Sequence, residues 1–182
     1  MTDSTAAALA DRQAIVDVVV QYATGVDQRD WALYEACFTD PVEVDFSSWS
    51  GRPARSMPAA EWARTVRSTN GNFETTQHLS TNHVVRFTSP DAATCISAMH
   101  AQHWYSAERL RQLGHDATEP RWCTLGGSYT NSLVRTSDGW RIARCELTVT
   151  WVTGDRSIFD LARSLGDPEL RAEQPPVRAG GG

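Results

Sequence analysis

Three ionisable residues lie on segments whose other residues are typical of a protein core. Asp27 ends an apolar helical face, and His78 and His103 lie on segments rich in β-forming residues. A carboxylate that hydrogen-bonds an imidazole fixes its tautomer, so that the ring can act as a general base or acid near neutral pH. Such a group contributes roughly 10² to 10⁴ in rate. If these three side chains meet in one pocket, the pattern predicts acid-base catalysis.

Two of these residues also have a structural interpretation. Asp27 could cap the helix that follows it, and the same side chain could still face a pocket. His78 shares a strand face with Thr76, Ser80 and Asn82. This polar face is either exposed to solvent or the hydrogen-bonding wall of a pocket. Both alternatives stay open at the level of sequence.

The spacing of His100 and His103 shows that only one of these two histidines can serve the site. His100 and His103 are three residues apart, so in a regular strand they point to opposite faces and cannot serve one site. The face of His103 carries small and apolar residues suited to a cavity, namely Cys95, Ser97, Met99 and Ala101. We therefore favour His103. A metal site needs converging ligands, and we expect none here.

Other polar and aromatic residues could bind a ligand beside these groups. Tyr22 lies on the apolar helix face, where it is either a core residue or a catalytic hydroxyl. We predict five substrate-binding residues: Asn131, Tyr129, Phe46, Trp62 and Met99. The sequence contains no nucleophile elbow, phosphate-binding loop or dinucleotide fingerprint. We therefore expect catalysis without a cofactor.

Composition excludes several other classes of function. The chain has 182 residues, enough for one domain, and a net charge of −5 with no run of Lys or Arg. Nucleic acid is therefore not expected as a partner, because that binding depends on clustered cations. The sequence has no membrane-spanning stretch and does not begin like a signal peptide, so we expect a cytoplasmic protein. The four cysteines are widely spaced and are interpreted as reduced, mostly buried thiols.

Helical patterns occupy the first part of the chain. Apolar residues recur at helical spacing from about residue 6 to residue 25, and Asp27-Gln-Arg-Asp30 predicts the start of a short second helix. Alternation over residues 42–46 predicts a strand, and Pro58 precedes a third helix over residues 59–68. We thus expect three helices before the main sheet.

Four long segments rich in β-formers follow, at about residues 73–88, 92–106, 121–136 and 140–153. Tight-turn sequences join the first two and the last two, so each pair should form a hairpin. Strands this long must curl to bury one face on the helices. We predict one α+β domain over residues 1–165, a cone-shaped barrel with a curved, mainly antiparallel sheet. Residues 166–182 are predicted to be a disordered tail.

Five short motifs in this order resemble the SnoaL-like branch of the nuclear-transport-factor-two-like superfamily, and within it the scytalone dehydratases. They are Tyr22-Ala-Thr-Gly-Val-Asp27-Gln-Arg-Asp-Trp31, Val44-Asp-Phe46, Met57-Pro-Ala-Ala-Glu-Trp62, Thr76-Gln-His78 and Asp138-Gly-Trp-Arg-Ile142. The similarity covers about residues 8–160 and implies the cone-shaped fold. It also implies a pocket with an aspartate and two histidines at Asp27, His78 and His103.

The sequence departs from that family at two positions. The dehydratase uses two tyrosines to polarise the substrate carbonyl, and Val26 and Phe46 stand at the matching positions. Scytalone is therefore not the expected substrate. Tyr22 resembles the tyrosine of related bile-acid dehydratases and could supply the missing hydroxyl. The family's serine and asparagine fall near residues 128–131, where the register is ambiguous.

Two functions fit these observations. The first is a cofactor-independent lyase or isomerase, of the dehydratase or cyclase type, acting on a small hydrophobic cyclic or polyketide-like carbonyl compound. The second is a non-catalytic ligand-binding or assembly subunit like the dioxygenase β chain, because the fold alone does not decide function. A homodimer or homotrimer is expected, with Trp104, Trp122 and Trp151 suited to the interface.

Overall fold

The computed structural model describes residues 2–172. Its helices are α1 (Thr2–Gln28), α2 (Trp31–Glu35), α3 (Ser47–Ser50), α4 (Ala59–Asn70), α5 (Ala107–Gln112), α6 (Ile158–Ser164) and α7 (Pro168–Ala172). Its strands are β1 (Phe38–Asp45), β2 (Arg55–Met57), β3 (Thr75–Ser89), β4 (Ala92–Tyr105), β5 (Arg121–Thr136) and β6 (Gly139–Gly154). The four longest strands begin and end within two residues of their predicted limits.

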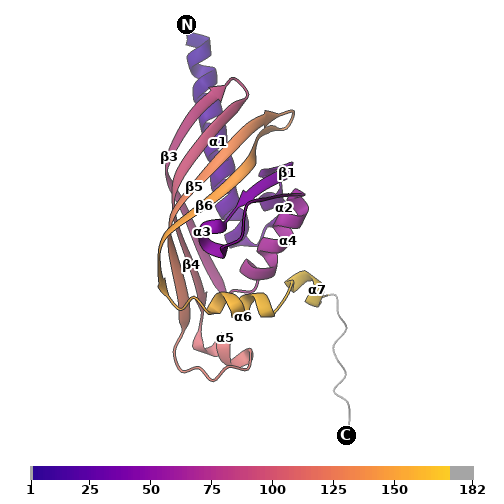
Figure 1. Ribbon diagram of the computed structural model, residues 1–182, viewed down its shortest axis with the longest axis vertical. Coiled ribbons are helices and arrows are strands. Elements are labelled where there is room, and N and C mark those ends of the chain that lie inside the picture. Colours follow the sequence, from indigo (N-terminus) through magenta and orange to yellow (C-terminus); the bar gives the residue numbers. More distant parts are fainter. Residues whose placement is uncertain (1, 173–182) are drawn as a thin grey trace.

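One curved sheet forms the wall of the molecule. Its strand order is β2-β1-β6-β5-β4-β3, and every pair is antiparallel except β1 with β6. The sheet is not closed, since β2 and β3 are its two edges, and it curves around α1 (Figure 1). The predicted α+β class with a curved, mainly antiparallel sheet is therefore confirmed.

A break in the pairing of β5 with β6 coincides with a pair of glycines. The register shifts between Gly126 and Gly127. A Cβ atom on Gly127 would collide with the carbonyl oxygen of Thr148, and one on Gly126 would collide with the indole of Trp151. Only glycine fits such a close approach, and a bulge of this kind bends a strand.

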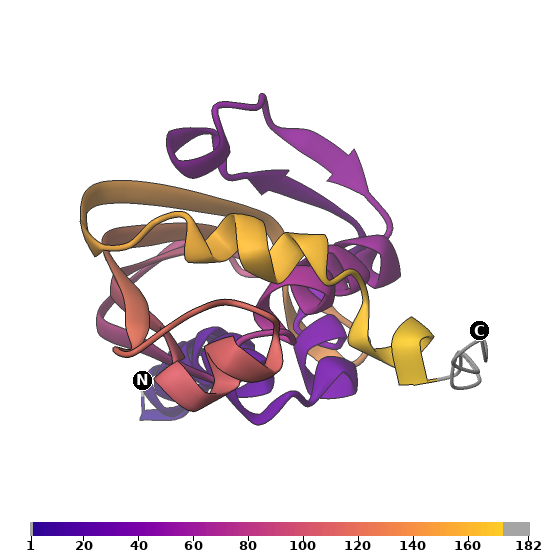
Figure 2. The same cartoon turned by 90° about the horizontal axis from the view of Figure 1, so that it is seen from below.

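Helices cover the concave face of the sheet. The apolar stripe of α1 includes Ile15 and Val19, which are fully or almost fully buried, and each such side chain contributes roughly 1.5 to 3 kcal/mol. Gly25 lets α2 approach α1, because a Cβ atom there would lie 2.9 Å from the backbone nitrogen of Tyr34. Helix α6 lies across the lower end of the sheet (Figures 1 and 2). The space left between these helices and the sheet is where the site lies.

Several short helices differ from the sequence predictions. Four helices, rather than three, precede the long strands, because α3 follows β1; α5 lies in the connection predicted as a loop. Within the predicted tail, residues 166–172 contain α7, and Asp167 is paired with Arg67 at 2.7 Å. The rest of that tail, residues 173–182, lies outside the described residues. The domain limit at residue 165 stays a prediction.

The convex face of the sheet carries exposed apolar side chains. They are Leu79, Val84, Ile96 and Trp151. Trp104 and Trp122 are half-buried. A homodimer or homotrimer formed through this face stays a prediction. None of the helices within residues 2–172 has the length and apolar character needed to cross a membrane.

Candidate active site

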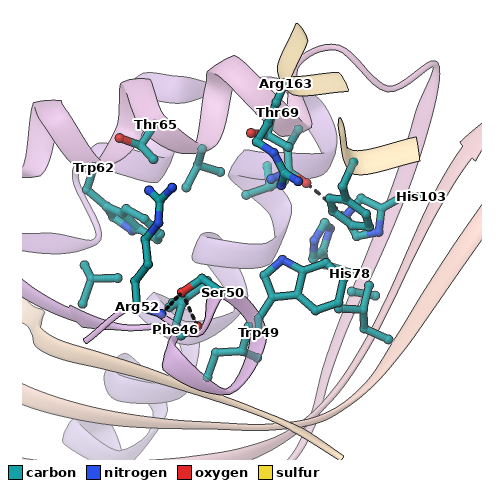
Figure 3. A pocket seen from close by; sticks show the side chains of 18 of the residues that line it. Phe46, Trp49, Ser50, Arg52, Trp62, Thr65, Thr69, His78, His103 and Arg163 are labelled. Atoms are coloured by element: carbon teal, nitrogen blue, oxygen red, sulfur yellow. Dashed lines mark hydrogen bonds between the residues drawn. The ribbon is translucent and has the colours of Figure 1, made fainter. Parts of the chain in front are cut away.

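A cavity of about 850 Å³ lies between the concave face of the sheet and helices α3, α4 and α6 (Figure 3). Most of its wall is apolar, with side chains from strands on one side and helices on the other. The apolar residues include Val26, Val44, Phe46, Trp62, Met99 and Leu125. His78 and His103 line it as well, with the His78 side chain 9% exposed and His103 3% exposed. A cyclic molecule of moderate size would fit this space.

Asp27 lies at the end of α1 and contacts β3. Its Oδ1 accepts a hydrogen bond from the hydroxyl of Thr76 at 2.8 Å and lies 2.7 Å from His78 Nδ1. Its Oδ2 accepts from the backbone N–H of His78 at 2.6 Å. Burial raises the pKa of the Asp27 carboxyl, but these contacts from His78 and Thr76 outweigh burial and hold the pKa below its ordinary value. Asp27 is therefore a carboxylate, and His78 Nδ1 carries the proton.

The capping alternative for Asp27 is not what the structure shows. The side chain of Asp30 caps α2, accepting from the backbone N–H of Leu33 at 2.9 Å. Asp27 is not among the residues that line the cavity. It lies behind His78, which lines the cavity, and contacts the ring of that residue.

His78 stands on the inward face of β3. Its side chain is 9% exposed, and Thr76 on the same face is buried, so this part of the polar face is not the solvent face, whereas Asn82, at a shift in register, is exposed. Nδ1 is held by Asp27, and Nε2 makes no hydrogen bond to any residue between 2 and 172. A neutral ring with its proton on Nδ1 has a free lone pair on Nε2. His78 can therefore accept a proton from a molecule in the cavity.

His103 lies beside His78 on β4 and is 3% exposed. The two rings are perpendicular, with centroids 5.2 Å apart. His103 Nε2 lies 3.0 Å from Asn70 Oδ1. Burial, with smaller effects from the charges of His78 and Arg29, holds the pKa of His103 well below its usual range. The ring is therefore neutral. His100, three residues earlier, is exposed on the other face beside Trp151.

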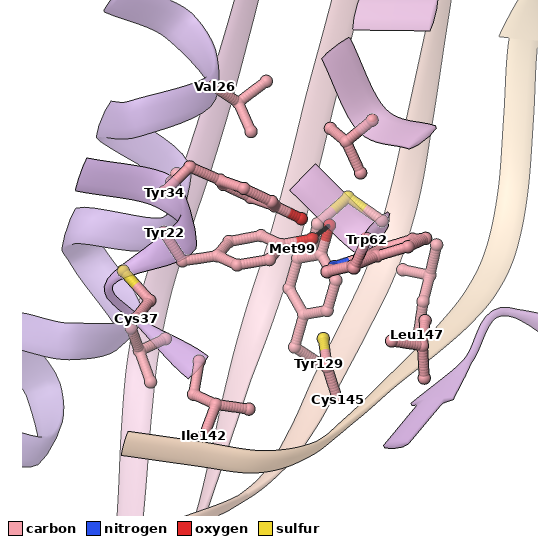
Figure 4. Close-up of a cluster of buried hydrophobic side chains, with 14 of the residues drawn as sticks. Tyr22, Val26, Tyr34, Cys37, Trp62, Met99, Tyr129, Ile142, Cys145 and Leu147 are labelled. Carbon is pink, nitrogen blue, oxygen red and sulfur yellow. Dashed lines mark hydrogen bonds between the residues drawn. The ribbon is translucent and has the colours of Figure 1, made fainter. Parts of the chain in front are cut away.

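Two tyrosine side chains, Tyr22 and Tyr129, meet within a cluster of buried side chains (Figure 4). The Tyr22 hydroxyl donates to that of Tyr129 at 3.3 Å, and both residues line the cavity. Burial raises the pKa of both phenols well above the usual value, so they stay protonated. Trp62, which also lines the cavity, has its Nε1 buried without a partner among the described residues. These groups are neutral donors suited to a ligand oxygen.

Comparison with known families identifies the chain. The model of a family described as "SnoaL-like domain" matches residues 7–146. The chain belongs to the SnoaL-like family. The resemblance inferred from the sequence motifs is thereby confirmed, and so is the cone-shaped fold.

Two curated relatives cover most of this SnoaL-like chain. An uncharacterized protein of Mycobacterium tuberculosis H37Rv is 28% identical over 138 residues, which are 76% of this chain and 84% of that protein. The terrestric acid biosynthesis cluster protein E of Penicillium crustosum is 25% identical over 154 residues, which are 84% of this chain and 91% of that protein.

Solved structures show the same fold. The Kfla4162 protein of Kribbella flavida is 32% identical, with a TM-score of 0.72 over 86% of this chain and 99% of that one. A protein of Novosphingobium aromaticivorans, provisionally assigned as a scytalone dehydratase, is 22% identical, with a TM-score of 0.66 over 86% and 93%. A LinA-type3 hexachlorocyclohexane dehydrochlorinase from Novosphingobium barchaimii is 18% identical, with a TM-score of 0.63 over 81% and 92%. Some solved proteins with this fold thus carry dehydratase or dehydrochlorinase names.

The substrate-binding residues predicted for this SnoaL-like domain are not all in one place. Phe46, Trp62, Met99 and Tyr129 line the cavity. Asn131 is buried with its Oδ1 unpartnered among the described residues, but it does not line the cavity. It stands opposite Cys95 and Cys145 in the sheet, deeper in the core.

Two polar residues of the site were not predicted from the sequence. Asn70, the last residue of α4, contacts His103. Arg29 has a φ of 60°, and its guanidinium donates to Thr76 Oγ1 at 2.8 Å and to the carbonyl oxygens of Val26 and Phe73. Asn70 ends one helix and Arg29 directly follows another, and neither position carries a sequence signal for its contact. Both depend on which distant strand the helix meets.

Proposed function

We propose that this protein is a cofactor-independent lyase or isomerase, of the dehydratase or cyclase type, acting on a hydrophobic cyclic or polyketide-like carbonyl compound. The observation that carries the proposal is the Asp27–His78 pair at the wall of an apolar cavity. The carboxylate fixes the proton on Nδ1, and Nε2 is left as a base toward the cavity. The dehydratase and dehydrochlorinase names among the structural neighbours support the same reaction class.

The proposed chemistry begins with removal of a proton next to a carbonyl group. His78 Nε2 takes the proton, and the electron pair of the C–H bond moves toward the carbonyl oxygen, giving an enolate. A hydroxyl of the Tyr22–Tyr129 pair or the N–H of Trp62 donates to that oxygen. Asp27 stabilises the imidazolium that forms, because opposite charges in contact attract strongly away from bulk water.

Two outcomes complete the reaction without a cofactor. In a dehydration, the enolate forms a C=C bond while the β C–O bond breaks, and the imidazolium gives its proton to the leaving hydroxyl as water. In an isomerisation, the imidazolium returns the proton to another carbon. Both outcomes regenerate neutral His78, so atoms and charges balance. His103 stays neutral and packs against the ring of His78, which transfers the proton.

The test replaces one histidine at a time. In a screen of cyclic β-hydroxy ketones, formation of the conjugated enone is followed by its ultraviolet absorbance. His78→Gln should lower kcat by roughly 10² to 10⁴, the contribution of a general base. His100→Gln is the matched control, because His100 is exposed on the opposite face of the sheet. It should leave the rate unchanged.

A second readout separates proton removal from loss of the leaving group. Ketones that lack a β-hydroxyl should exchange their α-hydrogens with D₂O in the presence of the enzyme, as followed by proton NMR. Folded His78→Gln protein with the same turnover and the same exchange rate as the wild type would refute the proposed function.

A further inference from the structure

Arginines surround the outer part of the cavity. Four of them line it, Arg52, Arg55, Arg156 and Arg163, and the single acidic lining residue is Asp160. The chain as a whole carries a net charge of −5. The positive charge at this opening is therefore opposite in sign to that of the rest of the protein. A cleft lined by one sign of charge attracts ligands of the other sign.

Three of the four guanidinium groups already have partners. Arg163 pairs with Asp160 at 2.5 Å, and Arg55 lies 3.6 Å from a Glu61 oxygen. Arg156 lies 4.0 Å from the centre of the Trp49 ring and donates to its carbonyl oxygen.

The Arg52 guanidinium, in contrast, has no ion pair or hydrogen bond to any residue that the structure describes. It extends across the cavity toward Trp62 and Thr65 (Figure 3). Arg163 reaches in from α6, on the side of Thr69 and His103 (Figure 3). Arg52 is thus the free cation of the described lining.

Arg52 and His78 lie on different sides of the cavity (Figure 3). Arg52 is exposed and extends beside Trp62, which is in edge-to-face contact with Phe46 at 4.9 Å, whereas the side chain of His78 is 9% exposed. A substrate whose ring fills the middle would place one end beside Arg52 and the other beside the base. Guanidinium groups are the usual partners of carboxylates, through charge-assisted hydrogen bonds.

We propose that the substrate is a cyclic carboxylic acid whose carboxylate is bound at the cavity mouth by Arg52, with Arg163 adding its charge. This inference rests on the proposed function only in taking the same cavity as the substrate site. One anionic charge suffices, because Asp160 already shares Arg163. Arg52 is then a specificity-determining residue, remote from the bond that reacts.

The inference is tested by binding of matched ligand pairs. The probes are 2-naphthoate, trans-cinnamate and cyclohexanecarboxylate, each compared with its primary amide by isothermal titration calorimetry on the full chain. At least one acid should bind roughly tenfold more tightly than its amide, about the contribution of one charge-assisted hydrogen bond. The preference should weaken as salt is added, because screening acts on the charge alone.

Two arginine variants test whether Arg52 is the residue that binds the carboxylate. Arg52→Gln should remove most of the preference for the acid, with the affinity for the amide unchanged. Arg64→Gln makes the same change of charge on the exposed surface of α4, outside the cavity lining, and should behave as the wild type. Equal affinities for every acid and amide, no binding of any acid, or equal effects of the two variants would overturn the inference.

The two proposals fail in different ways. An Arg52-dependent preference for acids, together with full activity of His78→Gln, would keep the anion site and refute the proposed chemistry. An inactive His78→Gln with no discrimination between acids and amides would keep the chemistry and refute the anion site.

Discussion

The two cavity histidines lie close together but have different hydrogen-bond partners. His78 contacts a carboxylate, Asp27, at 2.7 Å, while His103 contacts a carboxamide, Asn70, at 3.0 Å. A carboxylate stabilises a protonated imidazole, and an amide oxygen without charge does so far less. The two rings, with centroids 5.2 Å apart, therefore differ in how strongly their partners stabilise the protonated form.

Their charged neighbours reinforce this difference. A proton on His78 is balanced by Asp27. A proton on His103 would be buried, and both Arg29 and a charged His78 would repel it. We therefore infer that His78 is the base and that His103 is its neutral neighbour, packed against Phe73 and Phe159 with ring centroids 4.8 and 4.5 Å away. The hydrogen-bond partner of each histidine therefore determines the role that we infer for it.

The largest loss of activity should come from giving the two histidines the same kind of hydrogen-bond partner. Asp27→Asn gives His78 a carboxamide partner like that of His103. An amide does not stabilise the imidazolium, and its N–H₂ can donate to Nδ1, which would move the ring proton to Nε2 and remove the base. We expect kcat to fall by at least about a hundredfold, within the usual contribution of such a group. The measurement is kcat and kcat/KM on the compound found by the screen.

Folding must be checked in the same sample, because Asp27 also accepts the backbone N–H of His78. Circular dichroism and the urea midpoint serve as the control. Activity within threefold of the wild type in folded Asp27→Asn protein would mean that the carboxylate does not set the state of His78.

A smaller effect concerns stability against pH. The folded pKa of His103 lies below the ordinary value of about 6.5 that applies in the unfolded chain. As the pH falls below about 6.5, the unfolded state takes up a proton first. Stability is therefore fully present above this pH and is lost toward the folded pKa, by up to about 1.4 kcal/mol per pH unit for one group. Urea unfolding at pH 7.5, 6.0 and 5.0 measures this loss.

The reciprocal substitution gives the control. Asn70→Asp supplies His103 with a carboxylate, which raises its folded pKa, so the loss between pH 6.5 and 5 should become shallower than in the wild type. The lowered pKa of His83 contributes the same background to both proteins. Identical slopes in the two proteins would show that His103 does not titrate as inferred.

The strand patterns predicted the sheet face on which each site residue lies, but not its position along the strand relative to the cavity. The opposite directions of His100 and His103 follow from the period of two, and the structure has one exposed and the other buried. The same rule placed Asn131 and Tyr129 on one inward face. It says nothing about position along the strand, and two residues, roughly 6.6 Å, separate a side chain in the cavity from one outside it.

Short elements and tertiary contacts were beyond the sequence patterns. Helices α3, α5, α6 and α7 have four to seven residues, too few to show a full amphipathic repeat. The N-cap signal at Ser106, which accepts from Arg109 N–H at 3.0 Å, was available and could have revealed α5. No local signal could show that Asn70 meets His103, because that contact depends on how α4 lies against β4.

The smallest effect is expected where the backbone is strained. Arg29 has a left-handed conformation, φ 60°, just after α1. Its guanidinium bonds Thr76, whose hydroxyl in turn donates to Asp27. Arg29→Gly and Arg29→Ala both remove this support, and each should lower kcat several-fold, less than Asp27→Asn, because Asp27 keeps its two contacts with His78. They differ in strain, since only Gly adopts this conformation freely.

Comparison of these two variants separates strain from support. Arg29→Ala should be less stable than Arg29→Gly by about 1 kcal/mol, the usual cost of a left-handed conformation for a residue with a Cβ. Their activities should be equal, because both lack the guanidinium. Urea unfolding and kcat, measured on the same preparations, decide both points. A Gly variant with wild-type activity would show that His78 and Thr76 hold Asp27 without help from Arg29, and the contrast between the two histidines would then rest on Asp27 and Asn70 alone.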